Sequence, residues 1–391
     1  MQSFSQFIKG VNPDYLSLVI GINNTTGLSI IRDLGIHNVA VIGLDENSIA
    51  IGRFSKYCKH FIKYSDESHL LKTLINVGKK LKNKIPIFVS SDNLVIFIEK
   101  KKHILSDYFL FYWQGKKSLL DLIDKRKMLK FAEHAGLDIP QTFFSSDNTV
   151  ATIEKQMKYP SVVKPPFTKG KKLVVVNSRE EFLNVITDQL FENGFIVQEL
   201  IPGLETNIFL SGTYSNNKGE LIVCACGKKE RQLPKNFGFA TKAVAIKSDA
   251  INKLSEKFIK YLKYNGPADI EFKKSDTNGK YIFVEINPRF PGFNQLFTSS
   301  GFTIAYATFL DLKKQLNNNI ITNPEHREVR YMSIFFDFIT VFRSYNDVSL
   351  YRWLKELVQC NSFAVFSLRD PGPFCAQFIN LLSRAITWHC P

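Results

Sequence analysis

Residues 268–289 read ADIEFKKSDTNGKYIFVEINPR, the pattern of two β-strands joined by a short turn. Asn278-Gly279 is a common turn dipeptide, and apolar residues alternate with polar ones in the flanking runs. Strand residues two apart share a face, so Glu285 and Asn287 are expected to point the same way. Where Glu271 points depends on the turn between the strands.

The length of that turn decides whether a metal site can form. A two-residue turn sets Glu271 opposite Ile286, on the wrong face, whereas a three-residue loop over 277–279, with Gly279 left-handed, sets it opposite Glu285. Two carboxylates and an amide oxygen then converge, and because adjacent carboxylates repel, a cation is expected between them. Oxygen ligands of this kind suit Mg²⁺, which usually shares substrate phosphates. The alternative is an exposed, solvated acidic hairpin.

The first hundred residues alternate short apolar runs with helix-like stretches. Runs at 16–20, 39–44 and 85–89 are candidates for buried strands, and their spacing around helices favours an open parallel sheet. The Gly21…Gly27 turn departs from the GxGxxG spacing, so it is a weak dinucleotide signal and a plain tight turn is the simpler interpretation.

The spacing of apolar residues changes in the middle of the chain. A single helix is expected around 119–135, and from residue 161 onward most apolar runs have a period of two, which indicates strands. The last 65 or so residues are mixed and rich in aromatic side chains. The sequence therefore predicts an α/β part followed by an α+β part.

Composition limits the kind of protein this can be. The chain has 391 residues, 45% of them apolar, and a formal net charge of +15. The lysines lie in scattered short runs, so we expect a Lys-rich surface with phosphate ligands in one cleft and no nucleic acid partner. The six cysteines contain no CxxC pair and indicate a reducing compartment. We see neither a signal peptide nor a stretch long enough to span a bilayer, and we expect a cytoplasmic protein.

Five motifs, taken in order, resemble the ATP-grasp superfamily. They are Lys125 in Asp-Lys, Lys164 after two valines, the segment VQELIPG at 197–203, Glu205, and EINPR at 285–289. Each motif is weak alone, and their correct order over about 200 residues makes the signal strong.

Further segments resemble the D-aspartate ligase-like, carboxylate–amine ligase branch of that superfamily. Residues 18–58 are similar to its pre-ATP-grasp domain, residues 227–238 to its Arg-and-Pro loop, and residues 369–373 to its C-terminal Asp-Pro-x-Pro segment. The resemblance covers nearly the whole chain and is weakest at 1–15 and 325–360.

The resemblance implies a definite architecture. It consists of a Rossmann-like pre-ATP-grasp domain over 1–115, a two-lobed ATP-grasp domain with antiparallel sheets over 116–322, and a small C-terminal extension over 323–391. The flexible lobe of the ATP-grasp domain is expected at about 122–200.

It also implies roles for particular residues. Lys125 and Lys164 would hold the phosphates of ATP. The adenine hinge would be Gln198, Glu199, Leu200 and Ile201, with Glu205 on the ribose. Glu271, Glu285 and Asn287 would hold one or two Mg²⁺ ions, for which Mn²⁺ could substitute. Arg289 would bind the transferring phosphoryl group or a substrate carboxylate, and Arg231 is the second candidate for this role. For each arginine the alternative is a structural salt bridge.

One loop departs from the family pattern. The phosphate-covering loop is usually glycine-rich, but residues 166–172 contain one glycine, Gly170. Lys169 and Lys171 could supply positive charge in place of backbone N–H groups. An ordinary exposed basic loop is the alternative.

The implied activity is ATP-dependent joining of a carboxylate to an amine through an acylphosphate, with release of ADP and phosphate. The partners would be small molecules, an amino acid or similar carboxylate and an amine from a cell-wall or polysaccharide precursor, and a homodimer is an option. Two alternatives stay open: a nucleotide-binding protein without turnover, and an acylphosphate-forming enzyme with a different nucleophile.

Overall fold

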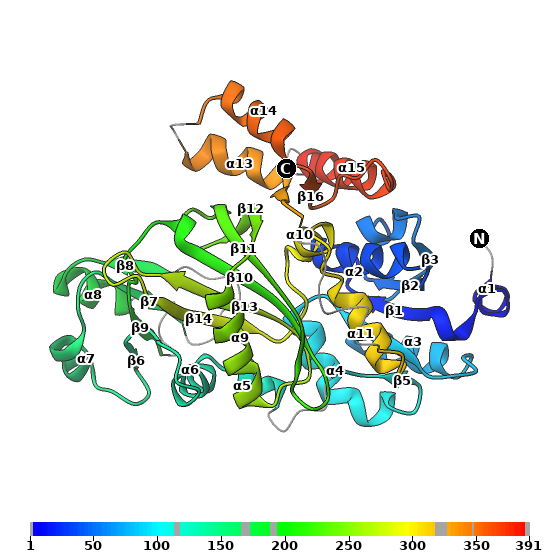
Figure 1. Cartoon of the computed structure of the whole chain (residues 1–391), viewed down its shortest axis with the longest axis horizontal. Coiled ribbons are helices and arrows are strands. Elements are labelled where there is room, and N and C mark those ends of the chain that lie inside the picture. Colours follow the sequence, from blue (N-terminus) through cyan, green and yellow to red (C-terminus); the bar gives the residue numbers. More distant parts are fainter. Residues whose placement is uncertain are drawn as a thin grey trace.

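The computed structural model describes residues 3–112, 118–165, 173–187, 194–316, 327–345 and 348–387. An N-terminal domain lies beside a large antiparallel sheet, a smaller lobe flanks the other side of that sheet, and C-terminal helices lie across one end (Figure 1). The α/β and α+β organisation predicted from the sequence is confirmed.

The N-terminal domain is built on a parallel five-stranded sheet with the order β3-β2-β1-β4-β5. Every residue of β1 and β4, two of the three inner strands, is buried, as expected for a parallel sheet covered on both faces. The strands are β1 (Leu16–Ile20), β2 (Ala40–Asp45), β3 (Cys58–Lys63), β4 (Ile85–Val89) and β5 (Phe109–Leu110). The helices are α1 (Phe4–Lys9), α2 (Thr25–Ile36), α3 (Glu67–Gly78) and α4 (Asp92–Leu105).

The turn before α2 is tight, as its glycines suggested. Gly21 is left-handed, with φ of +80°, and a Cβ on Gly27 would lie 2.3 Å from the carbonyl oxygen of Gly21. The side chain of Asn24 caps the helix by accepting a hydrogen bond from the Gly27 N–H at 2.8 Å. This close approach brings the first residue of α2, Thr25, to the edge of the neighbouring domain, where its hydroxyl donates to the Gly292 carbonyl.

The smaller lobe is an antiparallel four-stranded sheet in the order β6-β9-β7-β8. It has its own apolar core, in which Phe182 and Val197 are fully buried. Its strands are β6 (Thr142–Phe144), β7 (Ser161–Lys164), β8 (Val174–Val176) and β9 (Ile196–Glu199). Its helices are α7 (Val150–Gln156) and α8 (Arg179–Ile186), whereas α6 (Lys125–His134), which precedes the lobe, packs through Met128 and Leu129 on the core of the large sheet.

The helix expected over 119–135 is two helices, which corrects the prediction. The first, α5 (Leu119–Ile123), ends at Asp124, whose backbone is extended with φ of −70° and ψ of 110°. The Asp124 carboxylate accepts hydrogen bonds from the N–H groups of Arg126 and Lys127 and so begins α6. Lys125 is therefore the first residue of a capped helix.

The large sheet has seven strands in the order β14-β13-β10-β11-β12-β15-β16. Helix α9 covers one face, where Ser255 bonds Ser211, and α10 and α11 cover part of the other, where Phe297 and Ile304 abut Gly212. The strands are β10 (Ile208–Ser215), β11 (Leu221–Leu233), β12 (Phe239–Ile246), β13 (Gly266–Lys274) and β14 (Tyr281–Asn287), and the helices are α9 (Asp249–Leu262), α10 (Asn294–Ser299) and α11 (Ile304–Leu312).

The β13–β14 hairpin places Glu271 opposite Glu285, but not through the three-residue loop that was predicted. Ser275 and Lys280 still form a backbone hydrogen bond, so the loop has four residues, 276–279, and Gly279 is left-handed as expected. That loop alone would put the strands out of step by one residue. A β-bulge at Val284 restores the pairing, because Phe272 pairs with Phe283 and the next pair is Glu271 with Glu285.

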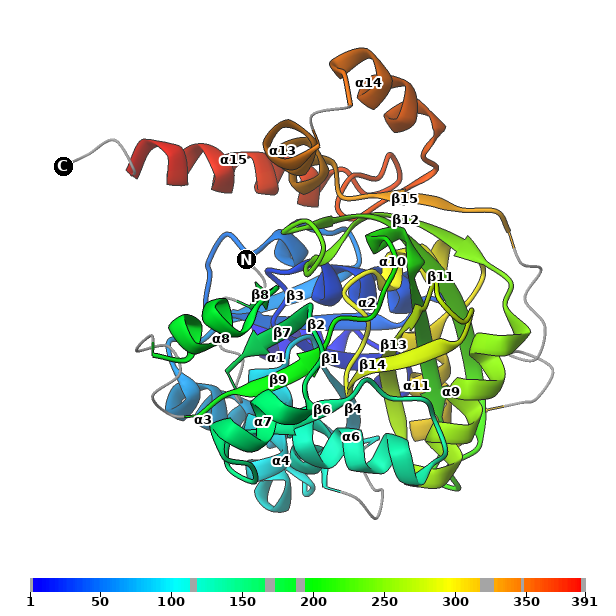
Figure 2. The ribbon, with the colours of Figure 1, turned by 90° about the vertical axis from the view of Figure 1, so that its left-hand side faces the viewer.

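The C-terminal segment extends the large sheet. Its strand β15 (Arg330–Met332) pairs antiparallel with β12, and β16 (Ser362–Phe363) pairs parallel with β15. Helices α13 (Ile334–Ser344), α14 (Leu350–Gln359) and α15 (Gly372–Thr387) lie above this edge, and α15 runs outward from the molecule (Figure 2). Over the stretches of chain described above, no helix has both the length and the apolar composition needed to cross a membrane.

A buried carboxylate ties the C-terminal segment to the N-terminal domain. Asp370, in the Asp-Pro-x-Pro stretch, lies 2.9 Å from the guanidinium of Arg32 on α2. It also accepts hydrogen bonds from the hydroxyl of Ser55 and the backbone N–H of Lys56, both at 2.8 Å. Arg32 further donates to the carbonyl of Val365. The residues of this motif therefore hold two distant parts of the chain together.

We expect Asp370→Asn to lower the free energy of unfolding by about 3–5 kcal/mol, because it leaves Arg32 buried without a countercharge. Denaturant titration, analysed for the first transition since a chain of several domains need not unfold in one step, measures this change. The matched control is Asp138→Asn, which removes a half-exposed pair with Lys280 and should cost about 1 kcal/mol at most. Equal losses in the two variants would contradict the assignment.

Candidate active site

A cavity of about 550 Å³ lies between the two antiparallel sheets. The smaller lobe contributes β7 and β9, the large sheet contributes β11, β13 and β14, and α2 and the C-terminal segment reach its rim. Ten of the residues singled out from the sequence line it: Lys125, Lys164, Gln198, Glu199, Leu200, Ile201, Glu271, Glu285, Asn287 and Arg289.

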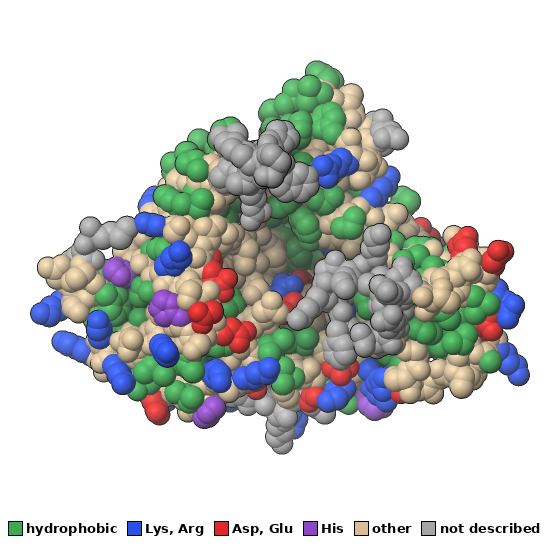
Figure 3. Space-filling model, turned by 180° about the vertical axis from the view of Figure 1, so that it is seen from behind, with side chains coloured by type: hydrophobic (Ala, Val, Ile, Leu, Met, Phe, Trp, Pro, Cys, Tyr) green, Lys and Arg blue, Asp and Glu red, His purple; other side chains and the backbone are tan. Residues whose placement is uncertain are grey.

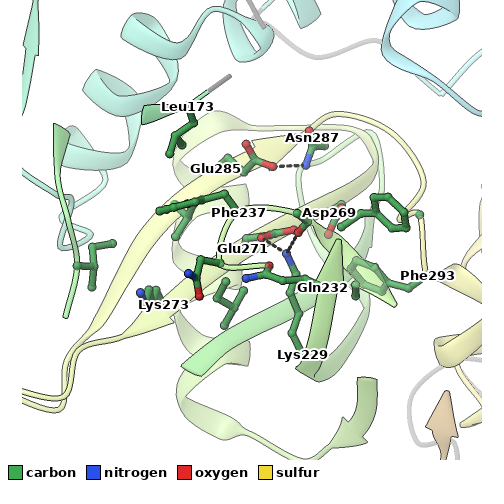
Figure 4. A pocket seen from close by; sticks show the side chains of 18 of the residues that line it. Leu173, Lys229, Gln232, Phe237, Asp269, Glu271, Lys273, Glu285, Asn287 and Phe293 are labelled. Carbon is green, nitrogen blue, oxygen red and sulfur yellow. Dashed lines mark hydrogen bonds and ion pairs between the residues drawn. The ribbon is translucent and has the colours of Figure 1, made fainter. Parts of the chain in front are cut away.

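Acidic side chains converge on the large-sheet side of the cavity (Figure 4). Glu271 and Glu285 are cross-strand neighbours, and the Asn287 side-chain amide donates a hydrogen bond of 3.1 Å to Glu285. The ammonium group of Lys229 lies 2.9 Å from the Glu271 carboxylate. Asp269, two residues before Glu271, shares this face of β13.

The surroundings shift the pKa values of these acids in opposite directions. Burial would raise the pKa of Glu285, but the Asn287 amide and three lysines, Lys125, Lys229 and Lys164, lower it overall. Burial raises the pKa of Glu271 despite its pairing with Lys229. Glu285 is therefore the carboxylate that is held ionised most firmly.

These residues fit a divalent cation that is shared with a phosphate. Over the described ranges, no three His, Cys, Asp or Glu side chains are grouped so as to hold a metal by themselves. Mg²⁺ is usually bound by one or two carboxylates, with waters and substrate phosphates completing its shell. Glu271, Glu285 and the side-chain oxygen of Asn287 match that donor set, so their role as ligands stays a prediction consistent with their placement.

Two lysines face the acids across the cavity, Lys164 from the smaller lobe and Lys125 from the start of α6. Lys164, at the end of β7, donates a hydrogen bond of 2.8 Å to the side chain of Gln198, which in turn donates to Thr142. Burial and the nearby charge of Lys125 lower the pKa of Lys164 to about 7. Burial also lowers the pKa of Lys125, against the effect of Glu285. An anionic ligand between them would stabilise both ammonium groups.

The segment expected to bind adenine lies along the same cavity. Residues 198 and 199 end β9, and residues 200 and 201 follow it. All four lie beside the apolar side chains of Val162, Leu173 and Ile208. The Leu200 N–H donates to the Pro160 carbonyl and the Glu199 carboxylate accepts from the Gln141 N–H. A flat apolar ring can therefore lie between the sheets here, against these apolar side chains.

The structure does not bring Glu205 into the cavity. It lies on a short 3₁₀ turn, Glu205–Asn207, where its carboxylate accepts from the Tyr345 hydroxyl and from the Asn236 N–H. Its expected ribose role has no support from this arrangement.

Arg231 also lies outside the cavity lining. A β-bulge at Glu230 turns it toward the C-terminal helices, where its guanidinium lies 2.6 Å from Asp337 and 2.5 Å from Glu356. The bulge gives the cavity position to the next residue, Gln232. The structure thus gives Arg231 the salt-bridge role that was its alternative. Lys169 and Gly170 lie outside the described residues.

Arg289 lines the cavity and is also partnered. Its guanidinium lies 2.8 Å from Asp92, the first residue of α4 in the N-terminal domain, and 3.9 Å from Asp269. Burial would lower the pKa of Arg289, but Asp92, Asp269 and Glu285 raise it overall. The residue joins the N-terminal domain to the metal face.

Several lining residues were missed in the sequence. Asp269 could have been found, because the period-two argument applied to Glu285 and Asn287 applies equally to Asp269 and Glu271. Lys229 lies on β11, which continues to Leu233, and no sequence signal distinguished it from the other lysines in the scattered short runs. No sequence signal indicated Gln232, or the contributions of the C-terminal segment, Tyr331, Ser333 and Phe336.

A family model for the ATP-grasp domain matches residues 122–293. This range contains both lobes and all the strands that line the cavity apart from the C-terminal edge. This part of the chain is an ATP-grasp domain, and the resemblance to the ATP-grasp superfamily noted in the sequence is confirmed. A comparison with curated protein sequences gave no significant match.

Solved structures share the fold at low sequence identity. N5-carboxyaminoimidazole synthetase from Staphylococcus aureus, in complex with ADP, has a TM-score of 0.60 at 17% identity, covering 77% of this chain and 78% of that one. L-amino acid ligase from Bacillus licheniformis has a TM-score of 0.60 at 15% identity, over 79% and 77% of the two chains. Biotin carboxylase from Campylobacter jejuni has 0.60 at 16%, over 78% and 73%.

We expect nucleotide binding to take up protons above neutral pH. With a pKa of about 7, Lys164 is mostly uncharged at pH 8, and the phosphates of ADP raise that pKa, so binding recruits a proton. At pH 6 Lys164 is already charged and the uptake should nearly vanish. Calorimetry in buffers of different ionisation enthalpy measures this difference.

Lys164→Arg is the diagnostic variant, because arginine stays charged at both pH values and should abolish the uptake. Lys155→Arg, on the exposed end of α7, is the control and should leave the uptake unchanged. Uptake that is equal at pH 6 and pH 8 would refute the role given to Lys164.

Proposed function

We propose that the protein is an ATP-dependent ligase that joins a small carboxylate to an amine through an acylphosphate. The observation that carries the proposal is the cross-strand pair Glu271 and Glu285, facing the partly buried lysines Lys125 and Lys164 across one cavity of an ATP-grasp domain. Partly buried acids opposite partly buried ammonium groups suit a ligand that brings both phosphate and a divalent cation.

The chain's own residues would act mainly by positioning. Lys125, at the start of α6, and Lys164, at the end of β7, bind the phosphates of ATP, and residues 198–201 bind the base. Glu271, Glu285 and Asn287 would hold Mg²⁺, which supplies charge neutralisation for the transferred phosphoryl group. Because Asn287 and three lysines keep Glu285 ionised, this acid is the one we expect turnover to depend on most.

Activation of a carboxylate explains why ATP is needed. An amine cannot readily displace the strongly basic oxide of a carboxylate, whereas phosphate is a far better leaving group. The lining residues that this scheme leaves free for these substrates include Thr25 from α2, Arg289, Phe293, and Tyr331, Ser333 and Phe336 from the C-terminal segment. Arg289 offers a guanidinium fork for a carboxylate or a phosphoryl group.

Two structural neighbours favour a specific second candidate. Biotin carboxylase and N5-carboxyaminoimidazole synthetase are named for carboxylated compounds or for carboxylation. This chain shares its fold with both of them as well as with an amino acid ligase. The carboxylate activated here could then be bicarbonate. Inclusion of bicarbonate among the tested carboxylates separates the two candidates.

A phosphate-release screen of carboxylates against amines, with ATP and Mg²⁺, tests the proposal. We expect release only when both a carboxylate and an amine are present, since an acylphosphate without its nucleophile stays in the site. Glu285→Gln should reduce the rate by at least about a hundredfold with the fold intact, through loss of the anion that holds Mg²⁺. Glu256→Gln, on the exposed face of α9, is the matched control and should be fully active. Release that never depends on an amine would refute ligation.

Gln232 allows a test of whether the carboxylate and amine substrates bind in this cavity. It is fully buried, lines the cavity, and neither its side-chain nitrogen nor its oxygen has a partner among the described residues. An unpaired buried amide costs about 1–3 kcal/mol, which a bound substrate can recover by pairing with it. We expect Gln232→Leu to raise the KM of the carboxylate or the amine about tenfold with the dissociation constant of ADP unchanged. Gln156→Leu, on the exposed end of α7, is the control. A variant that weakens only ADP binding would place Gln232 at the nucleotide instead.

A further inference from the structure

The C-terminal helices expose an unusual amount of apolar surface. On α14, Leu350, Leu354 and Val358 are four residues apart and form one outward stripe, with Tyr351 beside it. Val358 is 85% exposed and Tyr351 is 78% exposed. Isolated exposed apolar residues are ordinary, but a stripe of them marks an interaction surface.

The stripe continues onto the neighbouring helix. Phe338 and Phe342 of α13 are both exposed, their ring centroids are 4.6 Å apart, and the Phe338 ring lies 5.3 Å from that of Trp353 on α14. Trp353 itself is buried beneath them. Figure 3 shows the hydrophobic side chains gathered over this part of the molecule. We call the surface formed by Phe338, Phe342, Leu350, Tyr351, Leu354 and Val358 the α13–α14 face.

The charges around this face have one sign. Among the described side chains of the two helices, the exposed charged ones are Arg343, Arg352 and Lys355, all cationic. The two acids, Asp337 and Glu356, turn inward to Arg231, and Glu356 also lies 3.4 Å from the guanidinium of Arg352, so Arg343 and Lys355 carry most of the uncompensated charge. With 3.6 residues per turn, Lys355 and Arg352 follow Leu354 and Tyr351 around α14, so the helix has an apolar stripe with a basic flank. Helices that lie in a membrane interface have this pattern.

The charge pattern also decides between occupants. A second copy of the chain, docked through the same face about a two-fold axis, would place cations against cations. An anionic lipid bilayer presents negative charge to the basic flank and an apolar interior to the stripe. Its flat surface can contact both helices of the face at once. The exposed apolar residues Phe378, Ile379 and Leu381 on α15, with the exposed Arg369 ahead of that helix, repeat the combination nearby.

We propose that the α13–α14 face binds the surface of an anionic lipid bilayer. The proposal is independent of the chemistry assigned to the cavity, because none of the six residues of the face lines it.

Sedimentation of the full chain with vesicles tests this. We expect binding to phosphatidylcholine vesicles that contain about a third phosphatidylglycerol, weak binding to pure phosphatidylcholine, and loss of most binding when NaCl is raised from about 0.1 M to about 0.5 M. Val358→Glu should weaken binding at least about tenfold, since a carboxylate replaces an inserted side chain. Because Val358 is almost fully exposed, the fold should be unaffected.

Matched control variants distinguish binding through the α13–α14 face from non-specific binding of the protein to vesicles. Ile36→Glu changes an exposed apolar residue on α2 and should bind like the parent. The double variant Arg352→Ala, Lys355→Ala should weaken binding about tenfold to thirtyfold, because each basic residue contributes about fivefold. The control double variant Lys79→Ala, Lys82→Ala removes two exposed lysines elsewhere and should leave binding unchanged.

Three results would overturn the proposal. The first is absence of binding to the anionic vesicles. The second is an equal loss of binding in the control variants. The third is concentration-dependent self-association that Val358→Glu abolishes, without vesicle binding, since this would assign the face to a second copy of the chain.

Discussion

Two carboxylates, Glu271 and Glu285, face each other on a buried side of the large sheet, and their mutual repulsion governs the site around them. At the effective dielectric of a protein interior, unit charges about 4 Å apart interact by about 4 kcal/mol. A surface ion pair contributes about 1 kcal/mol at most, so one exposed lysine could not offset this repulsion. The chain surrounds the pair with less exposed cations instead: the buried Lys229 beneath, and the partly buried Lys125 and Lys164 across the cavity.

Interruptions of regular strand geometry place these charges. The bulge at Val284 corrects the step introduced by the four-residue loop and brings Glu285 opposite Glu271. The bulge at Glu230 turns Arg231 away from the cavity and admits Gln232. Without either bulge, the same sequence would present a different set of side chains to the ligand, because a shift of one residue reverses every side chain of a strand.

The limits of sequence reasoning follow from the same geometry. Because strand residues two apart share a face, the common direction of Glu285 and Asn287 was accessible, and the order of the five motifs made the superfamily accessible. The bulges were not accessible, because nothing in residues 229–233 or 281–285 distinguishes a bulged strand from a regular one. Glu205 could not be placed either, since its partner Tyr345 lies 140 positions away and belongs to a segment with no recognisable pattern.

The C-terminal segment is best understood as a fixed wall of the cavity. Asp337 on α13 accepts from the Arg231 guanidinium, the Thr241 hydroxyl and the Trp353 indole, all in the interior. Removal of one partner from such a buried pair costs about 3–5 kcal/mol, far more than the difference in binding between two related small substrates in one apolar pocket, about 1–3 kcal/mol.

Binding of a ligand therefore cannot readily tilt α13, and the side chains that precede and begin it keep their positions. Ser333 and Phe336 line the cavity within four residues of Asp337. Their shape and polarity, rather than movement of the helix, should thus set which substrates fit this end of the site. The opposite face of the same helix is held equally firmly, so the apolar and basic residues of the α13–α14 face are presented as a rigid surface.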